Sequence, residues 1–141
     1  MKKLFSLAAL SIVMFSSCKK DTPAATCNLD NNGILGDYKI TSILYKADAA
    51  TPEMDVFTTY SACEKDDIYT FSPNGIYVVT EGVTSCTPTN ATSGTWSLSG
   101  TTLTLDGSDV STVTNFSCGG FVINQSNVTT GESTKVTMVK Q

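Results

Sequence analysis

The segment IYTFSPNGIYVV, residues 68–79, decides the fold because it encodes a β-hairpin. β-Branched and aromatic residues dominate both of its halves, and such residues favour strands. At residues 73–75, proline presets the first turn dihedral, asparagine tolerates left-handed backbone and glycine supplies a positive φ angle. The segment therefore predicts two antiparallel strands, residues 67–72 and 76–81, that double back at this turn.

Strand signals recur along the rest of the chain. Ser99-Gly100 predicts a second tight turn, and no stretch shows the long 3.6-residue period of an amphipathic helix. A pair of glycines, Gly119-Gly120, interrupts one of the later apolar segments. The predicted strands cover residues 37–45, 54–60, 67–72, 76–81, 94–98, 102–105, 117–124 and 134–140.

Consecutive hairpins of this kind predict an all-β fold, a small antiparallel meander of about eight strands. A meander with one apolar face has to hide its edge strands, either by closing into a barrel or by folding into a sandwich. Once the N-terminal segment is set aside, roughly 105 to 110 residues remain, a length that suits one domain with one core.

The five cysteines fall into two groups. Cys18 belongs to the N-terminal segment, and Cys27, Cys63, Cys86 and Cys118 form an even set that is typical of disulfides in exported proteins. Four cysteines allow three pairings. Because Cys63 and Cys86 flank the predicted hairpin almost symmetrically, we expect them to pair and to leave Cys27 with Cys118, whereas a link from Cys27 to Cys63 would contradict this arrangement.

Metal binding finds little support in the sequence. No two cysteines have the spacing of a zinc ligand pair, and the chain has no histidine to complete a zinc site. Asn28, Asp30 and Asn32 follow the beginning of an EF-hand loop, but Lys39 occupies the place of the bidentate glutamate. We therefore expect no metal and no cofactor.

The N-terminal segment has the features of a bacterial lipoprotein signal. Lys2 and Lys3 precede an apolar run, residues 4–15, and two serines lead to Cys18. A run of about 12 residues is too short to cross a bilayer as a helix, but it suits a signal peptide that is removed. We expect residues 1–17 to be cleaved and Cys18 to carry acyl chains that hold the protein on a membrane. The alternatives are an ordinary secretory peptide cut nearby and an uncleaved amphipathic helix.

Charge and composition exclude several classes of function. Removal of residues 1–17 takes the net charge from −4 to −6, and all nine basic residues are lysines, so nucleic acid is an unsuitable partner. Without histidine, the common nucleophile-activating triads are also absent. Glu64, Asp66 and Asp67 cluster before a predicted strand, and we interpret them as a solvated surface rather than a catalytic carboxylate pair. We therefore expect a protein that is not an enzyme.

Three motifs together carry a family resemblance. They are residues 36–40 (GDYKI), residues 63–77 (CEKDDIYTFSPNGIY) and residues 94–98 (GTWSL) followed by the LTL of residues 103–105. From about Leu35 to its C-terminus, the chain resembles the lipocalin-like domain of many Bacteroidota lipoproteins. The first motif departs from that family in one respect, because a tyrosine stands where such domains often have tryptophan.

The resemblance implies a lipocalin-like β-barrel, with an interior that is either filled by side chains or holds one small ligand. It divides the chain into a signal peptide (1–17), a lipidated cysteine with its tether (18–33) and the barrel domain (34–141). Trp96 is expected to close one end of the barrel. The residues expected inside, as core or as pocket lining, are Tyr38, Ile40, Phe71, Tyr77, Trp96 and Leu103.

Two functions follow as hypotheses. In the first, a lipoprotein anchored at the outer membrane or cell surface of a Gram-negative bacterium binds a small hydrophobic ligand inside its barrel. In the second, the barrel is solid and its outer face or loops contact a protein or glycan as an accessory of a cell-surface complex. A cavity above about 300 Å³ favours the first hypothesis, and a filled interior opposes it.

Overall fold

The computed structural model describes residues 26–127 and 130–141. The predicted signal peptide and the predicted lipidation site, Cys18, lie outside these residues. Within the described part of the chain, no helix has the length and apolar character needed to span a membrane.

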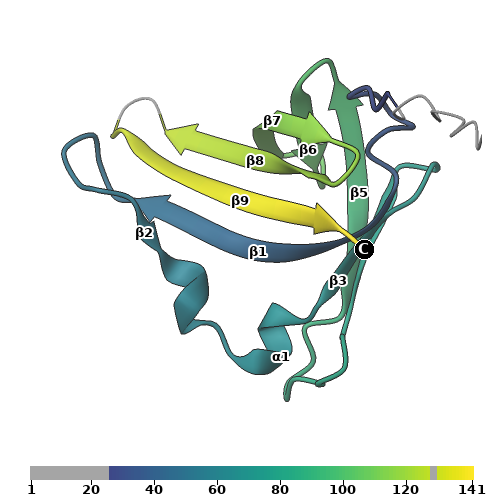
Figure 1. The fold of residues 1–141 in the computed structure, drawn as a ribbon, viewed down its shortest axis with the longest axis horizontal. Coiled ribbons are helices and arrows are strands. Elements are labelled where there is room, and N and C mark those ends of the chain that lie inside the picture. The colour runs from purple at the N-terminus through teal and green to yellow at the C-terminus, as the bar shows by residue number, and fades with distance from the viewer. Residues whose placement is uncertain (1–25, 128–129) are drawn as a thin grey trace, which may run out of the picture.

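Nine strands in the described residues form one antiparallel sheet, and eight of them close into a barrel (Figure 1). Each strand from β3 onward pairs with the next one along the chain, and β9 returns to pair with β1. This is the meander that the successive turns predicted. The strands are β1 (Gly36–Lys46), β2 (Met54–Asp55), β3 (Ile68–Phe71), β4 (Ile76–Thr80), β5 (Thr92–Ser99), β6 (Thr102–Leu105), β7 (Asp109–Ser117), β8 (Gly120–Asn127) and β9 (Glu132–Lys140).

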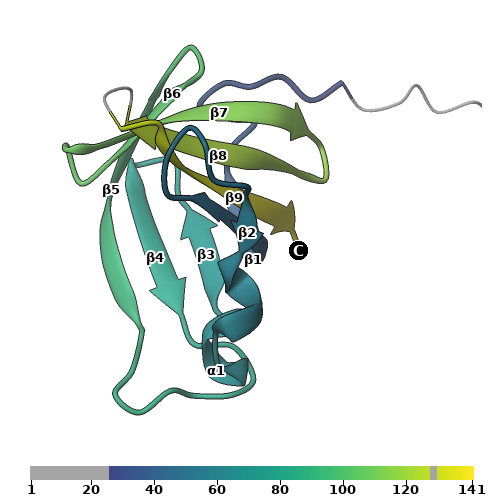
Figure 2. The same cartoon turned by 90° about the vertical axis from the view of Figure 1, so that its left-hand side faces the viewer.

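Two long strands make the closure possible. The first half of β5 pairs with β4 and its second half with β6, so β5 passes from one side of the barrel to the other. In the same way, β1 pairs along its length with β9, while its other edge pairs first with β3 and then with the short β2. As a result, β3 and β4 run across the direction of β7, β8 and β9 (Figure 2).

The structure differs from the sequence prediction in three stretches of the chain. The predicted strand over residues 54–60 is wrong after Asp55, because the 3₁₀-helix η1 (Val56–Thr59) follows. A short helix, α1 (Ala62–Lys65), was not expected. The predicted strand 117–124 joined two strands, since β7 ends at Ser117 and β8 begins at Gly120.

The first two differences have local causes. The Asp55 carboxylate accepts a hydrogen bond from the Phe57 N–H at 3.0 Å and thereby starts η1. At α1, the Ser61 N–H donates to the Glu64 carboxylate at 2.7 Å, and the Glu64 N–H donates back to the serine hydroxyl. This reciprocal capping box stabilises one helical turn where alternation alone suggested no helix.

Strand β7 was not predicted because, at its start, a polar residue faces inward and an apolar residue faces outward. The inward Ser111 is buried and donates a hydrogen bond to the carbonyl of Leu103, whereas the outward Val110 is 56 % exposed. After β7 ends at Ser117, Gly120 begins β8 with a φ of +146°, and a Cβ at this glycine would lie 2.1 Å from the Met138 carbonyl oxygen. The chain therefore turns at Gly119-Gly120 and does not continue as one strand.

Two disulfides join elements within the described residues, and they are the two that the sequence predicted. Cys27 pairs with Cys118, which fastens the N-terminal segment to the β7–β8 turn. Cys63 pairs with Cys86, which links α1 to the loop between β4 and β5. One bridge thus lies at each end of the barrel.

One end of the barrel is solid. The largest side chains that are fully buried there are Ile34, Tyr38, Leu103 and Phe121. Tyr38 makes an edge-on contact with Phe121, with 5.0 Å between ring centroids. Close packing of this kind leaves no room for a ligand at the end where Ile34 covers the barrel.

Candidate ligand-binding cavity

The other half of the barrel contains a cavity of about 560 Å³. All eight strands of the barrel contribute side chains to its wall. Alternate residues of a strand face the same side, and Tyr69 with Phe71 on β3 and Ile123 with Gln125 on β8 show this spacing of two. Most of the wall is apolar, including Ile40, Tyr69, Val79, Leu105, Ile123 and Val136.

Aromatic rings form the floor of the cavity. The Phe71 ring lines the cavity and also contacts Trp96 edge-on, with 5.8 Å between ring centroids. The indole Nε1–H of Trp96 donates to the carbonyl oxygen of Ser72 at 3.0 Å, so this buried polar group is satisfied. Trp96 therefore packs in the solid core and contacts the Phe71 ring of the cavity floor.

The six interior residues expected from the sequence divide between the two halves. Ile40, Phe71 and Tyr77 line the cavity, whereas Tyr38, Trp96 and Leu103 belong to the solid core. The wall residues of β7, β8 and β9 were not among those expected, although residues of β8 and β9 lie in segments that were predicted as strands.

Tyr77 is held across the wall by a hydrogen bond. Its hydroxyl donates to the Asp106 carboxylate at 2.8 Å, and Gly94 lies between them, where a Cβ would come within 2.6 Å of the tyrosine ring and 2.1 Å of that carboxylate. Burial, followed by the bond to Asp106, raises the pKa of Tyr77 to about 12. The ring thus closes the wall where β5 passes from β4 to β6.

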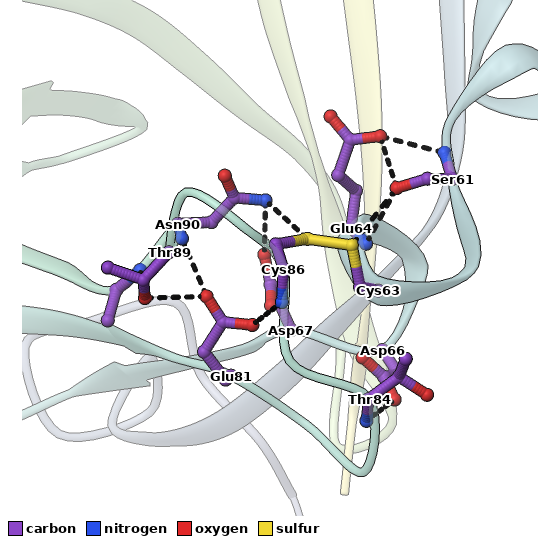
Figure 3. The surroundings of a disulfide bond; sticks show 11 residues. Ser61, Cys63, Glu64, Asp66, Asp67, Glu81, Thr84, Cys86, Thr89 and Asn90 are labelled. Atoms are coloured by element: carbon purple, nitrogen blue, oxygen red, sulfur yellow. Dashed lines mark hydrogen bonds between the residues drawn. A yellow bond between two sulfur atoms is a disulfide. The ribbon is translucent and has the colours of Figure 1, made fainter.

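The mouth of the cavity is polar and lies beside the Cys63–Cys86 disulfide (Figure 3). Exposed side chains there come from α1, from the loops and from the ends of β7 and β8. They are Tyr60, Glu64, Asn90, Asp109 and Gln125.

Glu81 orders the loop at this mouth. Its carboxylate accepts hydrogen bonds from the Cys86 N–H at 2.6 Å, the Thr89 hydroxyl at 2.7 Å and the Asn90 N–H at 2.6 Å. The bond from Thr89, together with those from the backbone, lowers the pKa of Glu81. Because Glu81 is fully bonded, it fixes the position of Asn90 beside the cavity.

Asp67 differs from the other carboxylates at the mouth because it is buried. It is 4 % exposed, and its Oδ2 accepts one long hydrogen bond from the Asn90 side-chain amide at 3.5 Å. Its Oδ1 has no hydrogen-bond partner among the described residues. Burial, reinforced by the negative charges of Glu81, Asp66 and Glu64, raises the pKa of Asp67.

The interpretation of the acidic cluster as a solvated surface is therefore wrong for one of its members. Glu64 is exposed and Asp66 is partly buried, with its Oδ2 accepting from the Thr84 N–H at 2.8 Å. Asp67, by contrast, precedes β3 at a position whose side chain lines the cavity. Spacing could have indicated this, because Asp67 lies two residues before Tyr69 and four before Phe71.

The calcium-like spacing near the N-terminal end of the described chain has a structural explanation. The Asp30 carboxylate accepts hydrogen bonds from the N–H groups of Asn32 and Gly33, at 2.9 and 2.7 Å. Its oxygen Oδ1 thus stabilises the turn that leads towards Ile34 and β1.

The family model described as a lipocalin-like domain matches residues 34–137, which is most of the chain. No curated protein and no solved structure shows significant similarity to this sequence.

Proposed function

The chain belongs to the family of lipocalin-like domains, and we propose that its barrel binds a small, mainly apolar molecule in the cavity between β3, β4 and the β7–β9 strands. The observation that carries this proposal is the cavity of about 560 Å³ with its apolar wall. Ligand sites in proteins typically occupy about 300 to 1,000 Å³ and combine apolar walls with a few polar groups.

Energetics also favour binding at this position. Each Å² of apolar surface removed from water contributes about 25 cal/mol, and the wall offers aromatic and aliphatic side chains from β1, β3, β4, β6, β8 and β9. Because antiparallel pairing on both sides fixes these strands, little conformational entropy is lost when a ligand enters. The solid-barrel hypothesis accounts for the end that contains Trp96, but the end that contains Tyr69 is hollow.

We propose further that the barrel acts beside a membrane, at the outer membrane or surface of a Gram-negative bacterium. The support comes from the sequence of residues 1–18 and their fit to a lipoprotein signal. Metabolic labelling with palmitate tests this proposal. The label should enter the wild-type chain and should be absent from Cys18→Ala; equal labelling of both chains would contradict it.

A fluorescent probe tests the binding proposal. N-phenyl-1-naphthylamine, a neutral apolar dye, should bind the full chain saturably and at one site, with energy transfer from Trp96, the sole tryptophan of the sequence. Val136→Phe adds a ring to the cavity wall and should weaken binding by about tenfold or more. Ile123→Phe, on the neighbouring strand, should do the same.

The matched control makes the same substitution on the outside of the barrel. Val110→Phe enlarges a side chain that is already 56 % exposed, and we expect unchanged dye affinity. Thermal melting of each variant establishes that it is folded. Absence of saturable binding by the wild-type chain, or equal binding by all variants, would contradict a ligand in the cavity.

A further inference from the structure

We infer that the ligand carries a positively charged amine head group and that the Asp67 carboxylate receives it, with the apolar tail directed towards Phe71. This inference rests on the proposed function, because it names the ligand class of the same cavity. It follows from the charge of the wall, the unsatisfied state of Asp67 and the order of side chains along β3.

The charged residues of the cavity all have one sign. Glu64, Asp67 and Asp109 line it, and no lysine is among the described residues that do so. The sequence supplies no arginine or histidine as a substitute. An anionic amphiphile such as a fatty acid would bring a further negative charge to these carboxylates, whereas an amine would neutralise one of them.

The lysines near this end are engaged elsewhere. The Nζ of Lys65, the last residue of α1, donates to the carbonyl of Thr58 at 3.0 Å and lies over the Phe57 ring. The Lys135 Nζ pairs with Glu53 on the outside of the barrel. Neither side chain lines the cavity, so neither balances Asp67.

Asp67 is the group that a ligand would complete. Buried carboxylates are normally paired or fully hydrogen-bonded, and an unsatisfied one is costly. Among the described residues, Asn90 alone donates a hydrogen bond to this carboxylate, at 3.5 Å, and Asn90 also donates to the Cys86 sulfur at 3.3 Å (Figure 3). Among the described residues, the Oδ1 atoms of Asp67 and Asp66 are both buried without a hydrogen-bond partner, and of these two side chains only Asp67 lines the cavity. An ammonium group supplies up to three donors at one point and can therefore complete the hydrogen bonding of the Asp67 carboxylate.

The order of side chains along β3 orients the molecule. Asp67, Tyr69 and Phe71 are spaced by two and all line the cavity, so they form one row from the mouth to the floor. A head group at Asp67 would leave the alkyl tail along Tyr69 and above Phe71, whose other side contacts Trp96. The row therefore fits an amphiphile with its polar end at the mouth.

Competition against the bound dye tests the inference. Decylamine, decanol and decanoate share one alkyl chain and differ in charge, and each is titrated into the full chain saturated with N-phenyl-1-naphthylamine. We expect decylamine to bind at least about tenfold more tightly than decanol, and decanoate to bind more weakly than decanol. Asp67→Asn should abolish the advantage of decylamine over decanol while dye binding persists.

Asp66→Asn is the matched control, because it removes the same charge one residue away from a side chain that does not line the cavity. Its preference for decylamine should stay within about twofold of wild type. If dye and decanol bind but decylamine has no advantage, or if Asp67→Asn retains it, the amine inference is wrong and the binding function stands. If neither dye nor decanol binds, the proposed function itself fails.

Discussion

Replacing both Cys63 and Cys86 by alanine removes the bridge between α1 and the loop at the mouth of the cavity. The two cysteines are separated by 23 residues in the chain. In the chain-entropy model, a cross-link over that distance restricts the unfolded chain and stabilises the fold by about 3.4 kcal/mol. We therefore expect the double variant to lose roughly this amount of its free energy of unfolding.

The second disulfide provides an internal comparison. Cys27 and Cys118 are separated by 91 residues, for which the same relation gives about 4.6 kcal/mol. The expected difference between the two double alanine variants, about 1.2 kcal/mol, depends only on loop length in this model. Removing the Cys27–Cys118 bridge, which closes the longer loop, should therefore lower the free energy of unfolding more, although this bridge lies at the end of the barrel without the cavity.

Equilibrium unfolding in urea, followed by the fluorescence of Trp96, measures both losses in the full chain. Trp96 suits this purpose because it lies in the solid core and exposes its indole only on unfolding. If removal of the Cys63–Cys86 bridge cost as much as removal of the other bridge, or more, restriction of the unfolded chain would not be the main source of stability. Native contacts around α1 would then have to supply the stabilisation.

Three further substitutions test the account at single residues. Since burial raises the pKa of Asp67, the folded state holds the proton of this carboxyl more tightly, and wild-type stability falls as pH rises above the unfolded pKa of 3.8. Asp67→Asn should therefore be more stable than wild type at pH 7, and the difference in unfolding free energy should close as pH falls towards 3.8. Urea unfolding at several pH values measures this difference. For Tyr77, the folded pKa of about 12 exceeds the ordinary value of 10.0, so wild-type stability relative to Tyr77→Phe should decline as pH rises between these values. A difference that stays constant over this range would contradict the raised pKa. Trp96→Phe removes the indole hydrogen bond to the Ser72 carbonyl, which keeps its bond from the Gly75 N–H, and should cost about 1 kcal/mol by circular dichroism melts. A neutral effect would show that the indole bond contributes little.

The strands that the sequence predicted well are those with clear alternation and clear turn residues. The hairpin of residues 68–79 folds as expected, with Phe71 opposite Tyr77. Strand β7 was missed because a buried serine and an exposed valine reverse the usual pattern. The helix α1 was missed although Ser61 and Glu64 have the spacing of a capping box, which is a readable signal.

The site was less predictable than the fold. Aromatic and aliphatic residues at alternating positions indicate the barrel interior, but they do not distinguish the solid end of Tyr38 from the hollow end of Tyr69. That division depends on closure of the sheet by β1 and β9, which are distant in sequence. Likewise, the burial of Asp67 depends on the loop that Glu81 holds over it, and local sequence does not encode that contact.

Native mass spectrometry of the protein isolated from its own host tests the central claim most directly, because a retained small molecule and a retained protein partner give distinct masses in one spectrum. The account predicts one small molecule bound per chain, lost on unfolding and depleted in the cavity-filling variant Val136→Phe but not in Val110→Phe. Equal retention by both variants, or retention of a protein partner with no small molecule, would contradict a ligand inside the barrel.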